Sequence, residues 1–180
     1  MGEDVERLKA EAEKYRSMKV KHAAAQKLFE AASLLHEKNE EAEALKLLLE
    51  AIMLAEEVKS QAMEDFFEEA AEKLDDMKQP KLAAENYIKT ARIHVNRKDH
   101  KGAIALFLKA EEAYRKANLP ADAAGCFRSV SEEYEGLGEP VLAAQHIEKE
   151  ADIRLQLKDT NGTIEDLNDA RGLYAKIGRF

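Results

Sequence analysis

DHKGAIALFLKAEEAYRKANLPADAAGCFRSVSEEYE, residues 99–135, holds one pattern twice at a spacing of 20 residues. Each copy places a small residue, an aromatic residue and a tyrosine at fixed steps: Ala103, Phe107 and Tyr114, then Ala123, Phe127 and Tyr134. These steps put the side chains on one face of an α-helix. Asp99 and Pro120 stand just before the two copies, and both residue types suit the first turn of a helix. The stretch therefore predicts two helices joined by a short turn.

The same spacing extends along most of the chain. The small column continues at Ala23, Met63, Ala83 and Ala143, the large column at Leu47, Phe67, Tyr87, Ile147 and Leu167, and the tyrosine column at Leu34, Leu54, Leu74 and Tyr174. Helix starts are expected near Asn39, Ser60, Pro80, Asp99, Pro120, Pro140 and Asp159. A period this regular is typical of stacked helical hairpins. We expect an all-α, right-handed solenoid of eight to nine antiparallel helices, tetratricopeptide-like with about 40 residues per hairpin, in one domain over residues 1–180.

The composition excludes several classes of protein. Charged residues make up 36% of the chain, the net charge is −8, and Cys126 is the only cysteine. An internal disulfide is therefore impossible, and no apolar run is long enough for an integral membrane segment. The acidic balance argues against nucleic acid as a partner, because phosphate contacts need clustered bases. We expect a cytoplasmic protein.

No group of residues has the arrangement of a catalytic site. Cys126 lies beside the apolar stripe, where a packed thiol is the simplest interpretation. The five histidines are scattered over different predicted helices, without the spacing of a zinc site. The glycines fall within Ala-rich helical segments and form no phosphate-binding loop. We therefore expect a protein that is not an enzyme and needs no cofactor and no metal.

Two stretches carry a resemblance to a known family. Residues 99–135, quoted above, and AAAQKLFEAASLLHEKNEEAEAL, residues 23–45, resemble the soluble NSF attachment proteins (SNAPs). The resemblance implies long tetratricopeptide-like helices and an adaptor role in vesicle trafficking. It also implies a helical-bundle or coiled-coil client of the SNARE type, together with an AAA-type ATPase.

The sequence departs from that family at three places. The family carries an apolar, membrane-touching loop between its first two helices, whereas this chain has RSMKVKHA at residues 16–23. Gly125 and Glu165 occupy two groove positions where the resemblance would give lysines. The family engages its ATPase through a C-terminal helical region, whereas this sequence ends at IGRF after about four hairpins. The resemblance therefore implies an adaptor without implying the same clients.

The predicted partner-binding residues lie on two helices that would line the concave face. Leu45, Leu49 and Ile52 form an apolar stripe outside the core periodicity of the helix that starts near Glu40. Lys89 and Arg92 would add a basic rim for an acidic partner. Two alternatives stay open for the stripe: burial under a capping N-terminal helix, residues 1–19, or exposure to a partner helix.

Two further functions also stay open. A regulatory domain could hold a short peptide or a small ligand in its groove, which an enclosed apolar pocket would favour. A homo-oligomer could instead use the stripe against a second copy of the chain, with a contact of more than about 1,000 Å² between identical chains.

Overall fold

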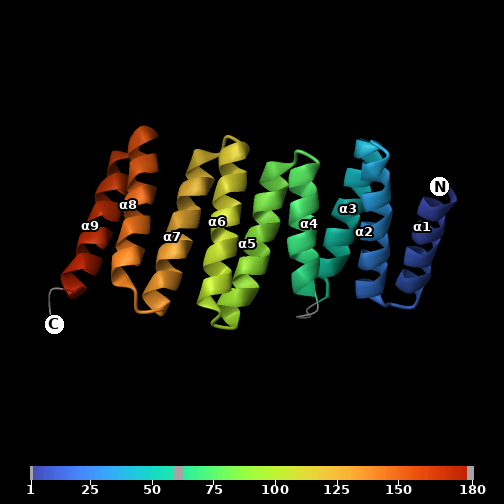
Figure 1. Cartoon of the computed structure of the whole chain (residues 1–180), viewed down its shortest axis with the longest axis horizontal. Coiled ribbons are helices and arrows are strands. Elements are labelled where there is room, and N and C mark those ends of the chain that lie inside the picture. Colours follow the sequence, from blue (N-terminus) through green and yellow to red (C-terminus); the bar gives the residue numbers. More distant parts are fainter. Residues whose placement is uncertain (1, 59–62, 178–180) are drawn as a thin grey trace. The chain divides into compact units, whose positions relative to one another are not determined.

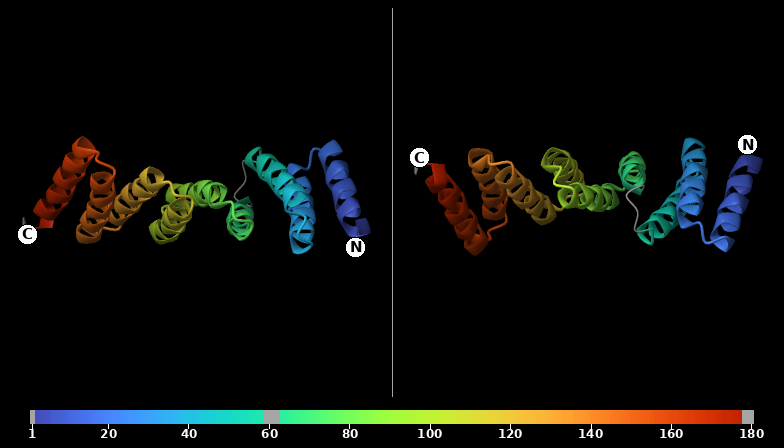
Figure 2. Two further views of the ribbon diagram at one scale, coloured as in Figure 1. Left: turned by 90° about the horizontal axis from the view of Figure 1, so that it is seen from above. Right: turned by 90° about the horizontal axis from the view of Figure 1, so that it is seen from below.

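The computed structural model describes residues 2–58 and 63–177, without the side chains of residues 2 and 64, and this part of the chain is helical with no strand. Nine helices follow one another there (Figure 1). Their bounds are α1 Gly2–Ser17, α2 Lys21–Glu37, α3 Glu41–Glu56, α4 Glu64–Asp76, α5 Pro80–Asn96, α6 His100–Lys116, α7 Pro120–Gly136, α8 Pro140–Gln156 and α9 Thr160–Ile177. The chain divides into two compact units, Met1–Gln79 and Pro80–Phe180. Within each unit, consecutive helices reverse direction and pack side by side, except that α4 makes few contacts with α3 (Figure 2).

One turn geometry recurs between helices. A residue with positive φ, between 57° and 74°, lies in each described turn: Lys19, Asn39, Lys78, Lys98, Asn118, Gly138 and Lys158. The residue after it donates its N–H to a carbonyl five positions back, as in Glu40 to Leu35 at 3.0 Å and Asp99 to His94 at 3.0 Å. This closure satisfies carbonyls that the helix end would leave without a partner. The turn thus fixes the 20-residue period.

Where the structure describes them, the predicted helix starts agree with the observed ones to within two residues, although Asn39 does not cap its helix. Asp99 and Asp159 cap their helices. Their carboxylates accept hydrogen bonds from the backbone N–H groups of Gly102 at 3.1 Å and Gly162 at 3.0 Å. Asn39 instead takes the left-handed position of the preceding turn, because a short polar residue tolerates positive φ, and Glu40 precedes the helix. Ser60 lies outside the described residues.

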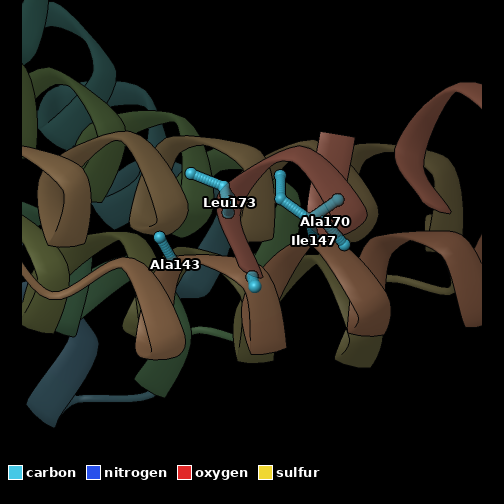
Figure 3. Packing of buried hydrophobic residues seen from close by; sticks show 5 residues of the cluster. Ala143, Ile147, Ala170 and Leu173 are labelled. Carbon is cyan, nitrogen blue, oxygen red and sulfur yellow. The ribbon is translucent and has the colours of Figure 1, made fainter. Parts of the chain in front are cut away.

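The repeating columns form the cores of both units. Ala83, Ala103 and Ala143 are fully buried, so neighbouring helices approach closely at these positions. In the second unit Ala143, Ala144 and Ile147 of α8 pack against Ala170 and Leu173 of α9 (Figure 3). The expected all-α solenoid of antiparallel helices is confirmed. Its right-handed sense and its union into one domain stay predictions.

The columns fail on α9. Leu167 and Tyr174 belong to columns that are buried or half-buried on other helices, yet their exposed fractions are 51% and 38%. The columns therefore do not predict burial on α9: Leu167 is exposed, and Tyr174 reaches α8 only at its rim, where its hydroxyl donates to Glu148 at 3.3 Å.

A buried ionic cluster holds α7, α8 and α9 together. Arg128 of α7 contacts Asp166 of α9, and its Nε lies 2.8 Å from Oε2 of Glu150 on α8. Arg154 of α8 contacts Oε1 of Glu150 at 2.7 Å and Oδ2 of Asp166 at 3.3 Å. Burial raises the pKa of both Glu150 and Asp166, and the two guanidinium groups partly offset that rise.

A candidate protein-binding surface

A largely apolar surface hollow in the first unit lies on α3. It has a volume of about 510 Å³, and all of its lining residues come from this one helix: Ala42, Leu45, Lys46, Leu49, Glu50 and Met53. Ala42, Leu45, Leu49 and Met53 follow one another at steps of three or four, so they form a single stripe along the helix. We call this stripe and its two charged neighbours the α3 hollow. Because one helix lines it, the hollow is an open surface rather than an enclosed pocket.

The α3 hollow overlaps the predicted stripe in two residues out of three. Leu45 and Leu49 are half-buried and line it. Ile52 is only 5% exposed and belongs to the core, which corrects its predicted place on the surface. The physical reason is its position about 40° around the helix from the fully buried Leu48. Met53, which is 65% exposed, takes the place expected for Ile52. The i+4 step from Leu49 is the signal that would have found it.

The N-terminal helix packs mainly against α2 and reaches α3 through ion pairs. Val5, Leu8 and Ala12 of α1 are buried. On the neighbouring side Lys9 pairs with Glu43, and Arg16 pairs with Glu50. The hydrogen bond from Lys9 lowers the pKa of Glu43 below its usual range. Two ion pairs thus fix α1 beside α3, while Leu45 and Leu49 stay partly accessible. Leu45 and Leu49 are thus neither fully buried under α1 nor fully exposed, and their role in partner binding stays a prediction.

The predicted basic residues lie in the second unit, on α5. Arg92 lines a groove of about 500 Å³ with Ile88 and Val95 of α5, Phe107 and Tyr114 of α6, and Gly125 and Ser129 of α7 among its other residues. A Cβ added at Gly125 would meet nothing within 4 Å, so the groove is open at this point. Lys89 is half-buried and is not among the lining residues. Of the two predicted bases, only Arg92 reaches the groove.

Cys126 lies on the same groove but offers no reactive thiolate. Its side chain is buried, and that burial raises the pKa of the thiol to about 12. A thiol with this pKa stays protonated at neutral pH, whereas a nucleophilic cysteine needs the thiolate. The side chain therefore fits a packing role. In the part of the chain that the structure describes, no group of His, Cys, Asp and Glu side chains could hold a metal ion.

No helix among the described residues combines the length and the apolar character needed to cross a membrane.

The comparison with protein families decides the relationship. The family model described as soluble NSF attachment protein, SNAP, matches residues 55–178, more than two-thirds of the chain. This chain belongs to the SNAP family. The SNAP match begins at residue 55, in the last turn of α3. The family relationship therefore covers Lys89 and Arg92 but does not extend to the α3 hollow.

Solved structures are similar to this chain only at low sequence identity. The chain is 14% identical to BtubC (BKLC) from P. vanneervenii, with a TM-score of 0.48 over 97% of this chain and 74% of that one. It is also 14% identical to a putative kinesin light chain of Podospora anserina with nearly identical TPR-like repeats, with a TM-score of 0.47 over 98% of this chain and 97% of that one. No curated protein matches the sequence.

The SNAP family suggests a protein-interaction scaffold, and its members are typically non-enzymatic adaptors. The α3 hollow and the α5–α7 groove are the surfaces on which such a scaffold would find a partner.

Proposed function

We propose that this SNAP-family chain is a non-enzymatic adaptor and that the α3 hollow binds a helical or coiled-coil segment of a partner protein. The observation that carries the proposal is the open apolar stripe of Ala42, Leu45, Leu49 and Met53 on α3. The stripe spans 12 positions, or about 17 Å along the helix axis, which matches three turns of a partner helix.

The side chains of the hollow suit a helical client. A partner helix would supply apolar residues at i, i+3, i+4 and i+7, the usual pattern of helix-in-groove binding. Met53 is flexible and polarisable, so it can adapt to the client's side chains. Lys46 and Glu50 flank the stripe and offer one charge of each sign to the rim of the contact. The stripe therefore has an apolar centre and a charged edge, as protein interfaces commonly do.

The family gives this proposal its cellular setting. We assign the client to coiled-coil bundles of the SNARE type, with an AAA-type ATPase as a second partner, in cytoplasmic vesicle trafficking. Arg92 on the α5–α7 groove, with Lys89 nearby on α5, would steer an acidic surface of the client. The open form of the α3 hollow favours a helix over a small ligand, which needs a more enclosed pocket.

The test uses Leu49→Glu with a purified SNARE-type coiled-coil bundle as the probe. Leu49 is half-buried on an open surface, so the new carboxylate stays hydrated and the thermal midpoint should change little. Binding should weaken by about tenfold or more, because the charge replaces an apolar anchor at the middle of the stripe. Isothermal titration calorimetry measures the affinity, and circular dichroism measures the midpoint.

Val141→Glu is the matched control, since Val141 is an exposed apolar residue on α8. It should leave the affinity unchanged. A drop of several degrees for Leu49→Glu would show that the hollow is covered in solution and would contradict the proposal. Concentration-dependent dimers abolished by Leu49→Glu would instead identify a second copy as the occupant.

A further inference from the structure

α9 carries a second apolar strip that is largely exposed; α8 touches it only at one edge, where the Tyr174 hydroxyl donates to Glu148 at 3.3 Å. Ile164 and Leu167 are 54% and 51% exposed, and Tyr174 is also exposed. These side chains and Arg171 lie within about 80° of one another around the helix. We call Ile164, Leu167, Arg171 and Tyr174 the α9 strip. A different side of α9, with Asp166, Ala170 and Leu173, is buried in the second unit (Figures 1 and 3).

The repeat shows what the α9 strip is shaped to contact. One period earlier the equivalent positions are Ala144, Ile147, Ala151 and Arg154 on α8, and two periods earlier they are Ala124, Phe127, Ser131 and Tyr134 on α7. On both helices these residues are buried or half-buried. Ile147 packs against Ala170 and Leu173 of α9, the next helix, and Tyr134 of α7 stacks on His146 of α8 with ring centroids 5.2 Å apart. In each case the side is covered by the following antiparallel helix. The α9 strip occupies the equivalent positions on α9, but no described helix follows to pack over it.

Arg171 determines which charge a helix packed on the α9 strip would have to carry. The small residues Ser131 and Ala151 hold this position on α7 and α8. Within the described part of the chain, Arg171 forms no ion pair, and a helix laid over the strip would remove its charge from water. A buried charge is tolerated only when it is paired. The second unit contains an example of such pairing, because Arg154 of α8 contacts the buried carboxylate of Asp166 on α9 at 3.3 Å.

We infer that the α9 strip binds an amphipathic helix of a partner protein, with apolar residues at helical spacing and a carboxylate placed against Arg171. This interface is separate from the α3 hollow and does not depend on it.

A second copy of the chain fits the strip poorly. A two-fold contact centred on the strip would place each Arg171 about 3 Å along the helix axis from the symmetry axis, so the two like charges would meet in an apolar contact. The outer side of α1 in another copy would bring exposed charges instead, from Glu3, Arg7 and Lys14. Neither of these two sides supplies an apolar stripe with a central carboxylate, and Glu50 beside the α3 hollow is already paired with Arg16.

The experiment uses two synthetic helical peptides of about 18 residues, five turns of helix. Both carry Ala and Leu along one stripe, and the central residue of the stripe is Glu in one and Lys in the other. Fluorescence anisotropy should show that the full chain binds the Glu peptide about tenfold more tightly than the Lys peptide. Arg171→Glu should reverse this preference, because the charges then pair the other way round.

Leu167→Glu should weaken binding of the Glu peptide by about tenfold or more, whereas Val141→Glu on α8 should leave it unchanged. Leu167 is half-exposed, so the variant should keep its thermal midpoint; Ile164→Gln provides a second, uncharged disruption of the strip. Equal binding of both peptides, or equal losses for Leu167→Glu and Val141→Glu, would overturn the inference. Dimers in sedimentation velocity that Leu167→Glu abolishes would overturn it as well, by naming a second copy as the occupant.

Discussion

The two end helices of the described structure, α1 and α9, differ in the kinds of side chain that they bury and expose. α1 buries the apolar side chains of Val5, Leu8 and Ala12 and exposes charged ones such as Arg7. α9 buries the carboxylate of Asp166 and exposes Ile164, Leu167 and Tyr174. Repeat proteins need polar outer faces on their terminal repeats, and α1 meets this requirement. The outer side of α9 has instead the character of an internal repeat.

The comparison shows that the buried side of an end helix can be apolar, as on α1, or can include charged groups, as on α9. The inner side of α9 combines the apolar packing of Ala170 and Leu173 with a buried carboxylate, Asp166, which Arg128 and Arg154 contact from α7 and α8. The inner side of α1 is held by apolar packing, with ion pairs only at its edge. A buried polar side can be retained only if every charge has a partner, so the two ends should respond differently to the same kinds of substitution.

The largest effect is expected from Asp166→Ala. Asp166 is fully buried between Arg128 and Arg154, and its removal leaves both arginines with Glu150 as their remaining buried carboxylate. The free energy of unfolding should fall by about 3 kcal/mol, the usual cost of breaking a buried ion pair. Urea unfolding followed by circular dichroism measures this change.

Asp169→Ala is the control for that substitution. Asp169 also contacts Arg128, at 2.7 Å, but its side chain is 57% exposed. An exposed pair contributes at most about 1 kcal/mol, so this variant should stay close to the parent. Equal losses for the two variants would mean that the inner side of α9 is hydrated and that the contrast with α1 is wrong.

A smaller effect is expected from truncating one leucine at each end. Leu8→Ala removes a buried side chain from α1 and should lower the free energy of unfolding by about 2 kcal/mol. Leu167→Ala removes an exposed side chain from α9 and should change it by less than about 0.5 kcal/mol. Thermal and urea unfolding of both variants give the comparison. A larger loss at Leu167 than at Leu8 would show that the α9 strip is packed in solution.

The sequence predicted the fold well and the surfaces only in part. The 20-residue columns located the helices because the same small and large residues recur wherever two helices pack. They failed at Leu167 and Tyr174, since a column records which residue type is present and not whether a neighbour covers it. They also missed Asp166 in the core, because its burial depends on Arg128 and Arg154 from two other helices. At the α3 hollow, Ile52 and Met53 are adjacent in the sequence, so their side chains point about 100° apart around the helix. One therefore lies in the core and the other on the surface.

The smallest effect concerns pH and has a different sign at the two ends. Burial raises the pKa of Glu150, so its charged form opposes folding. Stability therefore falls as pH rises from the unfolded-state value of 4.5 through the raised pKa, and it is regained as pH falls back toward 4.5. Lys9 lowers the pKa of Glu43, so that contribution is present above pH 4.5 and is lost only as pH falls below it.

Glu150→Gln should remove part of the stability gained as pH falls toward 4.5, whatever its stability at pH 7. Glu43→Gln should leave the range above pH 4.5 unchanged and reduce the loss below it. Urea unfolding at a series of pH values measures both slopes, and parental slopes for Glu150→Gln above pH 4.5 would show that this carboxylate is not desolvated.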